Sequence, residues 1–148
     1  MSFDGFAPGA ETALGEAVLN VLRADLNVQA HLGDPTRVID GDSRAAAFPF
    51  VQLERHEVRE GDALCRARQE HRLQLAVVSR TDWAADVQAL MGAMRAALEG
   101  ADWPAVMPDD QRVVAVLVTY SDVMRNRRRT AFRGVQRIKI LTEQVDAE

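Results

Sequence analysis

Residues 112–123 are the most strongly β-forming stretch of the chain, and they set the first limit on the fold. Their apolar residues are mostly β-branched, and they fall on both faces of an extended strand, as with Val113, Val116 and Leu117. A strand that is apolar on both faces is typical of the centre of a sheet or of a strand covered on both sides. We therefore predict that this strand is central or covered on both faces.

Alternating apolar and polar residues predict three more long strands. Residues 50–58 and 69–80 are separated by a loop over 59–68, and residues 112–123 and 131–145 by a loop over 124–130. Each pair predicts a long antiparallel hairpin. Residues 37–39 are compatible with a short extra strand. The second sheet face is partly apolar at Ala76, Val78, Val113 and Leu117, which suggests burial against another subunit.

Helical spacing of apolar residues predicts a helix that begins at Glu11 and a second helix before Gly100. A short helical turn follows the first helix at residues 25–30, and Thr81 or Asp82 is the expected N-cap of the second. The resulting order is α(α)-β-β-α-β-β. It predicts an α+β domain, with an antiparallel sheet of about four main strands and helices packed on one face. We expect one such domain over residues 11–148, after a flexible arm over residues 1–10.

Composition excludes several classes of protein. The chain has 148 residues, a net charge of −4 and 47% hydrophobic residues, as expected for one globular domain rather than a disordered chain or a coiled coil. No apolar run is long enough to span a membrane, and we see no signal peptide. A single cysteine, Cys65, excludes an internal disulfide and a multi-cysteine zinc site. We expect synthesis in the cytoplasm of a bacterial host.

No catalytic, cofactor-binding or metal-binding constellation is predicted. Strand alternation places His56 on the polar face and His71 on the apolar face, so the two rings should point to opposite sides of the sheet. We expect an exposed His56 and a half-buried, hydrogen-bonded His71. Cys65 has no base with an orienting third group, so a small enzyme is the weakest of the alternatives.

A dense arginine cluster marks the predicted turn of the second hairpin. It contains Arg125, Arg127, Arg128 and Arg129, and it is either a solvated loop or a contact for carboxylates or phosphate. The basic residues continue along one face of the last strand, and acidic residues of opposite sign lie in and after the first hairpin strand. The basic set adds Arg133, Arg137 and Lys139, and the acidic set is Glu54, Glu57, Glu60 and Asp62. Complementary patches on one chain suit a head-to-tail ring.

The order of these segments resembles the tail terminator family of long-tailed bacteriophages and gene transfer agents, over residues 13–143. The individual segments are only weakly specific, and their order and spacing carry the resemblance. They are the helix over 14–22, Leu26 to Leu32-Gly33, Arg37-Val38-Ile39-Asp40, Phe48-Pro49-Phe50-Val51-Gln52-Leu53, Glu70-His71-Arg72-Leu73, Val77-Val78-Ser79-Arg80, the alanine-rich helix to Leu98, the valine-rich strand, the arginine-rich turn and Leu141-Thr142-Glu143.

The resemblance implies a structural role in the virion, without catalytic residues or cofactors. It implies a homo-oligomeric ring, of six subunits, at the head-proximal end of the tail tube. Its partners would be the tail tube protein and the head connector or stopper protein. The genome would pass through the lumen without sequence-specific binding. The alternative is a small nucleic-acid-binding module that uses the arginine-rich tip, although the acidic net charge is unfavourable for it.

The arginine cluster gives a first testable prediction. In the double variant Arg127→Glu/Arg128→Glu, we expect assembly with a neighbour or partner to weaken, because two guanidinium groups become carboxylates and repel an acidic contact. The isolated chain should still fold, as circular dichroism would show. Unchanged particle assembly would contradict a contact role for these arginines.

Overall fold

The computed structural model describes residues 10–41, 47–60, 68–80, 84–125 and 131–145. Nine elements lie in these ranges, and they confirm the α+β class. They are α1 (Ala10–Ala24), α2 (Leu26–Leu32), β1 (Val38–Asp40), β2 (Phe50–Glu60), β3 (Arg68–Ser79), α3 (Ala84–Glu99), α4 (Trp103–Val106), β4 (Gln111–Arg125) and β5 (Phe132–Gln144). The predicted cap residues Thr81 and Asp82 lie outside the described residues.

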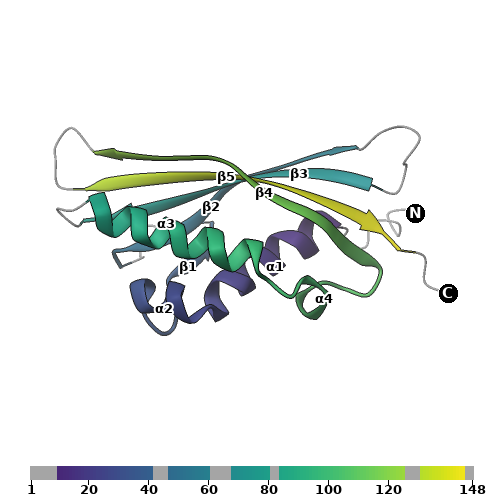
Figure 1. Cartoon of the computed structure of the whole chain (residues 1–148), viewed down its shortest axis with the longest axis horizontal. Helices are drawn as coiled ribbons and strands as arrows, with labels where there is room; N and C mark the ends of the chain where they lie inside the picture. Colours follow the sequence, from purple (N-terminus) through teal and green to yellow (C-terminus); the bar gives the residue numbers. More distant parts are fainter. Residues whose placement is uncertain (1–9, 42–46, 61–67, 81–83, 126–130, 146–148) are drawn as a thin grey trace.

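The five strands form one sheet in the order β1-β2-β3-β5-β4 (Figure 1). Both predicted hairpins, β2–β3 and β4–β5, are antiparallel as expected. Pairing of β3 with β5 joins the two hairpins. The short strand β1 runs parallel to β2, which adds a fifth strand to the four main ones. The connection before β4, expected without regular structure, holds the single helical turn α4, which has Pro104 at its start.

Of the two predicted alternatives for residues 112–123, a central strand is wrong, and the described part of the subunit by itself does not cover both faces of the strand. Strand β4 lies at the edge of the sheet and pairs only with β5 within the described part of the chain. Several of its apolar side chains are exposed, led by Leu117 at 51%. The residue pattern correctly indicates a strand that is apolar on both faces. It does not indicate whether segments of the same chain or another molecule contact those faces.

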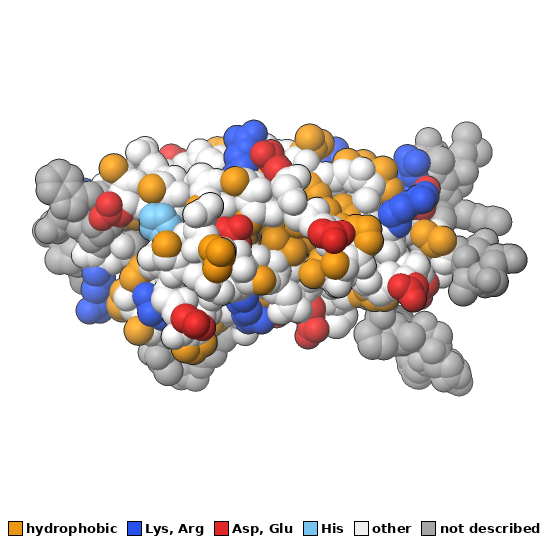
Figure 2. All heavy atoms as spheres, turned by 60° about the horizontal axis from the view of Figure 1, so that its bottom comes forward, with side chains coloured by type: hydrophobic (Ala, Val, Ile, Leu, Met, Phe, Trp, Pro, Cys, Tyr) orange, Lys and Arg blue, Asp and Glu red, His pale blue; other side chains and the backbone are white. Residues whose placement is uncertain are grey.

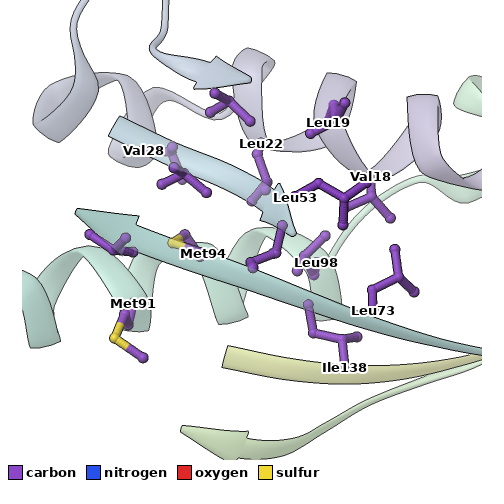
Figure 3. Packing of buried hydrophobic residues seen from close by; sticks show 14 of the residues in the cluster. Val18, Leu19, Leu22, Val28, Leu53, Leu73, Met91, Met94, Leu98 and Ile138 are labelled. Atoms are coloured by element: carbon purple, nitrogen blue, oxygen red, sulfur yellow. The ribbon is translucent and has the colours of Figure 1, made fainter. Parts of the chain in front are cut away.

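The helices lie on one side of the sheet, as predicted (Figure 1). Helix α1 buries a stripe that includes Leu14, Val18 and Leu22, because these residues follow the helical repeat. Helix α3 buries five residues in the same way: Val87, Leu90, Met91, Met94 and Leu98. Figure 3 shows side chains of α1 and α3 meeting Leu53, Leu73 and Ile138 from the strands. The contacts between these helices and the sheet form the hydrophobic core.

A glycine in β5 permits the close approach of α3 to the sheet. A Cβ atom at Gly134 would lie 2.5 Å from Sδ of Met91 and 3.0 Å from Cγ1 of Val87. Next to this contact, the Gln136 side-chain amide donates a hydrogen bond to the Met91 carbonyl at 3.1 Å, although Gln136 is buried. Packing and this hydrogen bond together hold α3 over β5.

A β-bulge in β2 overturns the prediction for the two histidines. The register with β3 shifts between Leu53 and Arg55, so Glu54 is an extra residue and every later side chain changes face. His56 therefore turns toward the helix side, where His71 already lies. The His56 Nε2 and His71 Nδ1 atoms are 2.8 Å apart. The prediction that the rings point to opposite faces is wrong.

The two rings belong to a buried hydrogen-bond chain. His71 is fully buried, and its Nε2 lies 2.9 Å from Oγ1 of Thr142 on β5. Burial, together with a smaller effect from the charge of a protonated His56, lowers the pKa of His71 to about 4. Burial also lowers the pKa of His56, despite the opposing charges of Glu11 and Asp40. Both imidazoles are therefore neutral at pH 7.

This burial predicts a loss of stability in acid. The pKa of His71 is below its ordinary value of 6.5, so its contribution is complete above pH 6.5 and is lost as the pH falls toward 4. The full loss is on the order of 3 kcal/mol. Urea unfolding at pH 7, 5.5 and 4 measures it.

The control for this titration is a pair of variants. Between pH 6.5 and 4, the unfolding free energy of His71→Gln should depend on pH much less steeply than that of the wild type. The variant should also be less stable at pH 7. The exposed His31 of α2 is a matched site, so His31→Gln should keep the wild-type slope. Equal slopes in the wild type and His71→Gln would contradict the assignment.

No helix in the described ranges is long and apolar enough to cross a membrane.

Candidate assembly surface

The sheet face turned away from the helices, here called the open face, carries most of the predicted charged residues. Arg133, Arg137 and Lys139 alternate along β5 and lie on this face, as expected from their spacing. The residues opposite Arg137 and Lys139 on β3 and β2 are also charged or polar, whereas Val78 lies opposite Arg133. The open face therefore combines the basic strip with its acidic neighbours. Figure 2 shows the opposite, helix side of the molecule, where acidic and basic side chains are interspersed.

A close charge pair on the open face joins Glu54 and Arg133 within one subunit. An Arg133 terminal nitrogen lies 2.5 and 2.6 Å from the two carboxylate oxygens of Glu54. Partial burial raises the pKa of Glu54, but hydrogen bonds from Arg133 and Gln74 outweigh it and leave the pKa below its ordinary value. Glu54 reaches Arg133 of β5 across the open face, so two residues predicted to meet a neighbouring chain meet each other.

Other carboxylates on this face also have partners in the same chain. Glu70 accepts a hydrogen bond from Arg72 at 2.6 Å and lies 3.5 Å from the Lys139 ammonium group. The bond from Arg72 is the main cause of the lowered pKa of Glu70. Glu57 lies 3.1 Å from Nε of Arg59. These exposed pairs contribute little to stability, and they limit the positive charge that the face presents.

A hollow of about 380 Å³ lies at the centre of the open face. Its charged lining consists of Arg55, Glu57, Arg72, Arg137 and Lys139. Arg137 donates from Nε to Gln74 at 3.1 Å, and its guanidinium group lies 4.7 Å from the centre of the Tyr120 ring. Four cations and one carboxylate leave the hollow positive, which suits an anionic ligand or partner.

Arg125 and Glu60, from the basic and acidic sets, lie at opposite ends of the sheet. Arg125 ends β4, and its guanidinium group lies 5.1 Å from the centre of the Phe132 ring. Glu60 ends β2, and the strand register places it level with Val113 at the far end of β4. Lateral neighbours at one height cannot bring these two ends together. The predicted contacts Arg127, Arg128, Arg129 and Asp62 lie outside the described residues.

An exposed apolar row on β4 was only partly anticipated from the sequence, which named Leu117 on an apolar second face but did not include the row among the candidate contacts. Val114, Leu117, Tyr120 and Met124 are 42–51% exposed. Leu117 and Tyr120 lie on the open face, opposite Lys139 and Arg137. The signal was present in the two-sided apolar pattern of residues 112–123, but that pattern alone does not place the strand at an edge.

Within the described ranges, no group of three or more His, Cys, Asp and Glu side chains is placed to hold a metal ion.

Comparison with known proteins identifies the family. The model of the family described as tail completion protein gp17 matches residues 16–143. The chain belongs to this family. Membership gives the tail completion protein a structural role and places it in the virion tail. No curated protein sequence matches it.

Two solved structures share the fold of this tail completion protein. One is a chain of the virion of a native gene transfer agent particle, with a TM-score of 0.77 and 24% identity, covering 93% of this chain and 99% of the other. The second is the gp17 protein of bacteriophage SPP1, with a TM-score of 0.59 and 14% identity, covering 93% and 91%. At these identities, the two matches establish the fold alone.

The Glu54–Arg133 pair predicts a measurable coupling within the isolated subunit. Glu54→Gln and Arg133→Met, alone and together, should give a double-mutant coupling energy of about 0.5–1 kcal/mol in urea unfolding at low salt, since the pair is partly exposed. The matched control is Glu60→Gln with Arg133→Met, at opposite ends of the sheet, which should show none. A coupling that appears only in assembled particles would instead assign the pair to a subunit interface.

Proposed function

We propose that this tail completion protein forms a ring of six copies at the head-proximal end of the tail tube. There it stops polymerisation of the tube and joins the tail to the head connector. Its partners are further copies of itself, the tail tube protein and the connector or stopper protein. The chain acts as a structural part and not as an enzyme.

The observation that carries the proposal is the unprotected edge of the sheet. Strand β4 has 15 residues, and its apolar side chains are exposed at Val114, Leu117 and Tyr120. Long apolar edge strands are avoided in monomers because they pair with other chains. A closed ring removes such an edge from solvent, since every subunit covers its neighbour.

The two ends of the sheet suit contacts above and below the ring. Arg125 lies at one end, together with Phe132, where β5 begins. Glu60 lies at the other end, close to the Arg68–Glu143 pair, whose nitrogen and oxygen are 3.2 Å apart. Two ends with different side chains, Arg125 beside Phe132 at one and ion-paired residues at the other, would let the ring bind the tube on one side and the connector on the other. The arginine tip would then contact a stacked partner rather than a lateral copy.

The open face suits passage of DNA. The hollow with Arg55, Arg72, Arg137 and Lys139 offers cations to phosphate groups, whatever the base sequence. Paired carboxylates such as Glu70 keep the attraction weak, which favours movement over tight binding. This face would line the lumen.

Electron microscopy of the purified protein tests the proposal. We expect rings from the protein alone, or caps on one end of tubes of limited length when it is mixed with tail tubes. Tubes should be longer and more variable in length without it. A chain that forms no ring, ignores tubes and binds duplex DNA with a steep salt dependence would contradict the proposal and favour a nucleic-acid-binding module.

A further inference from the structure

We propose that β4 of one copy pairs, antiparallel, with the free part of β2, Glu54–Glu60, of the next copy, so that a single sheet runs around the ring. The inference rests on the proposed ring. It adds which strands form the subunit interface and in which direction they run.

Strand β4 has few of the features that keep an edge strand unpaired. Residues 113–121 contain no charge and no proline. Edge strands of monomers are usually short, charged or interrupted by proline. Two bulges, at Val114 and Thr119, are the exception, and they leave residues 115–118 in regular pairing with β5. The outer backbone groups of this segment are open to a partner strand.

The opposite edge of the same sheet offers a complementary strand. The short β1 covers β2 only from Val51 to Leu53. Beyond that point, β2 has one neighbour, β3, in the described part of the chain. The seven residues Glu54–Glu60 therefore present a second row of unpaired backbone groups. A head-to-tail ring requires each copy to carry two different edges that can pair with each other, here β4 and the free part of β2.

Rotational symmetry sets the direction of the pairing. A rotation about the ring axis leaves up and down unchanged, so each copy keeps its strand directions. Strand β3 is antiparallel to β2, β5 to β3, and β4 to β5. Three reversals make β4 antiparallel to β2, and therefore also to β2 of the next copy. Neighbouring long strands within one subunit are also antiparallel.

Strand register places the two segments at the same height. Leu117 pairs with Lys139, Lys139 with Arg72, and Arg72 with Glu57. By the same steps, Val116 is level with Val58. Lateral copies at one height therefore set residues 113–118 of β4 beside Glu54–Glu60 of the neighbour, apart from a stagger due to strand tilt.

The side chains of the two segments are compatible. Leu117 lies on the open face, as do Arg55 and Arg59, whose side chains are 71% and 56% exposed. The aliphatic stems of these arginines can cover Leu117 and leave the guanidinium groups in water. Because residues 113–121 are uncharged, the pairing opposes no like charges.

The sheet formed in this way has a suitable size. Along the paired half, each copy contributes four strands, β2, β3, β5 and β4. With about 4.8 Å between strands, six copies give a backbone circle about 40 Å across. Helices inside this circle would fill it, since each is about 10 Å wide. The helices therefore lie outside, and the open face surrounds a channel wider than a DNA duplex.

Disulfide cross-linking in assembled rings tests the inference. In a Cys65→Ser background, which leaves no other cysteine, Leu117→Cys protein is mixed with Arg55→Cys, Glu57→Cys or Arg59→Cys protein and oxidised on tube ends. We expect a mixed disulfide between Leu117→Cys and at least one of the three β2 variants. Mass spectrometry identifies the linked peptides. The matched control is Leu26→Cys on α2, where Leu26 is 79% exposed and should form no mixed disulfide.

Each result separates the interface from the ring itself. Rings without a mixed disulfide would overturn the β4–β2 pairing and leave the proposed function intact. A dominant Leu117–Leu117 disulfide would assign β4 to a two-fold contact and also overturn the pairing. Absence of rings in the Cys65→Ser parent and the wild type would contradict the proposed function.

A disruptive variant gives independent evidence. Leu117→Lys adds a charge to the edge and should abolish ring and cap formation, while circular dichroism and monomer stability stay close to those of the wild type. Leu26→Lys is the matched change on α2 and should assemble normally. Normal assembly of Leu117→Lys would overturn the inference.

Discussion

The pairing of β3 with β5 is the interaction on which the rest of the structure depends. It joins two hairpins that are distant in the sequence, through twelve consecutive residue pairs without a bulge. Gly134 of β5 admits α3 to the face of this pair, and Gln136 binds the α3 backbone. Because β5 lies between β3 and β4, and no other described strand pairs with β4, β4 is an edge strand and its apolar side chains are left exposed.

One-sided packing explains how the tail completion protein can serve as a ring subunit. All four helices lie on one side of the sheet, so the core needs no help from a neighbour. The open face and both sheet edges are then available for contacts. An ion-paired open face suits DNA passage, whereas an apolar edge suits a stable subunit contact. The proposed ring assigns a different task to each surface.

Several candidate residues could be found from sequence, but their partners could not. The alternation along β5 correctly placed Arg133, Arg137 and Lys139 on one face. The acidic residues were treated as contacts for another chain, yet Glu54 binds Arg133 in the same subunit. The bulge between Leu53 and Arg55 leaves no local mark in the sequence. The same single-residue shift brings His56 to His71 and defeats simple alternation.

The sequence by itself determined the four long strands, their two hairpins and the apolar faces of α1 and α3, because these follow from repeats of 3.6 and 2 residues. It also determined that residues 112–123 are apolar on both faces of the strand. Only the tertiary structure decided that β5, and not β4, pairs with β3, and that a bulge follows Leu53. Both outcomes depend on packing between distant segments, where α3 meets Gly134, and local patterns do not encode such contacts.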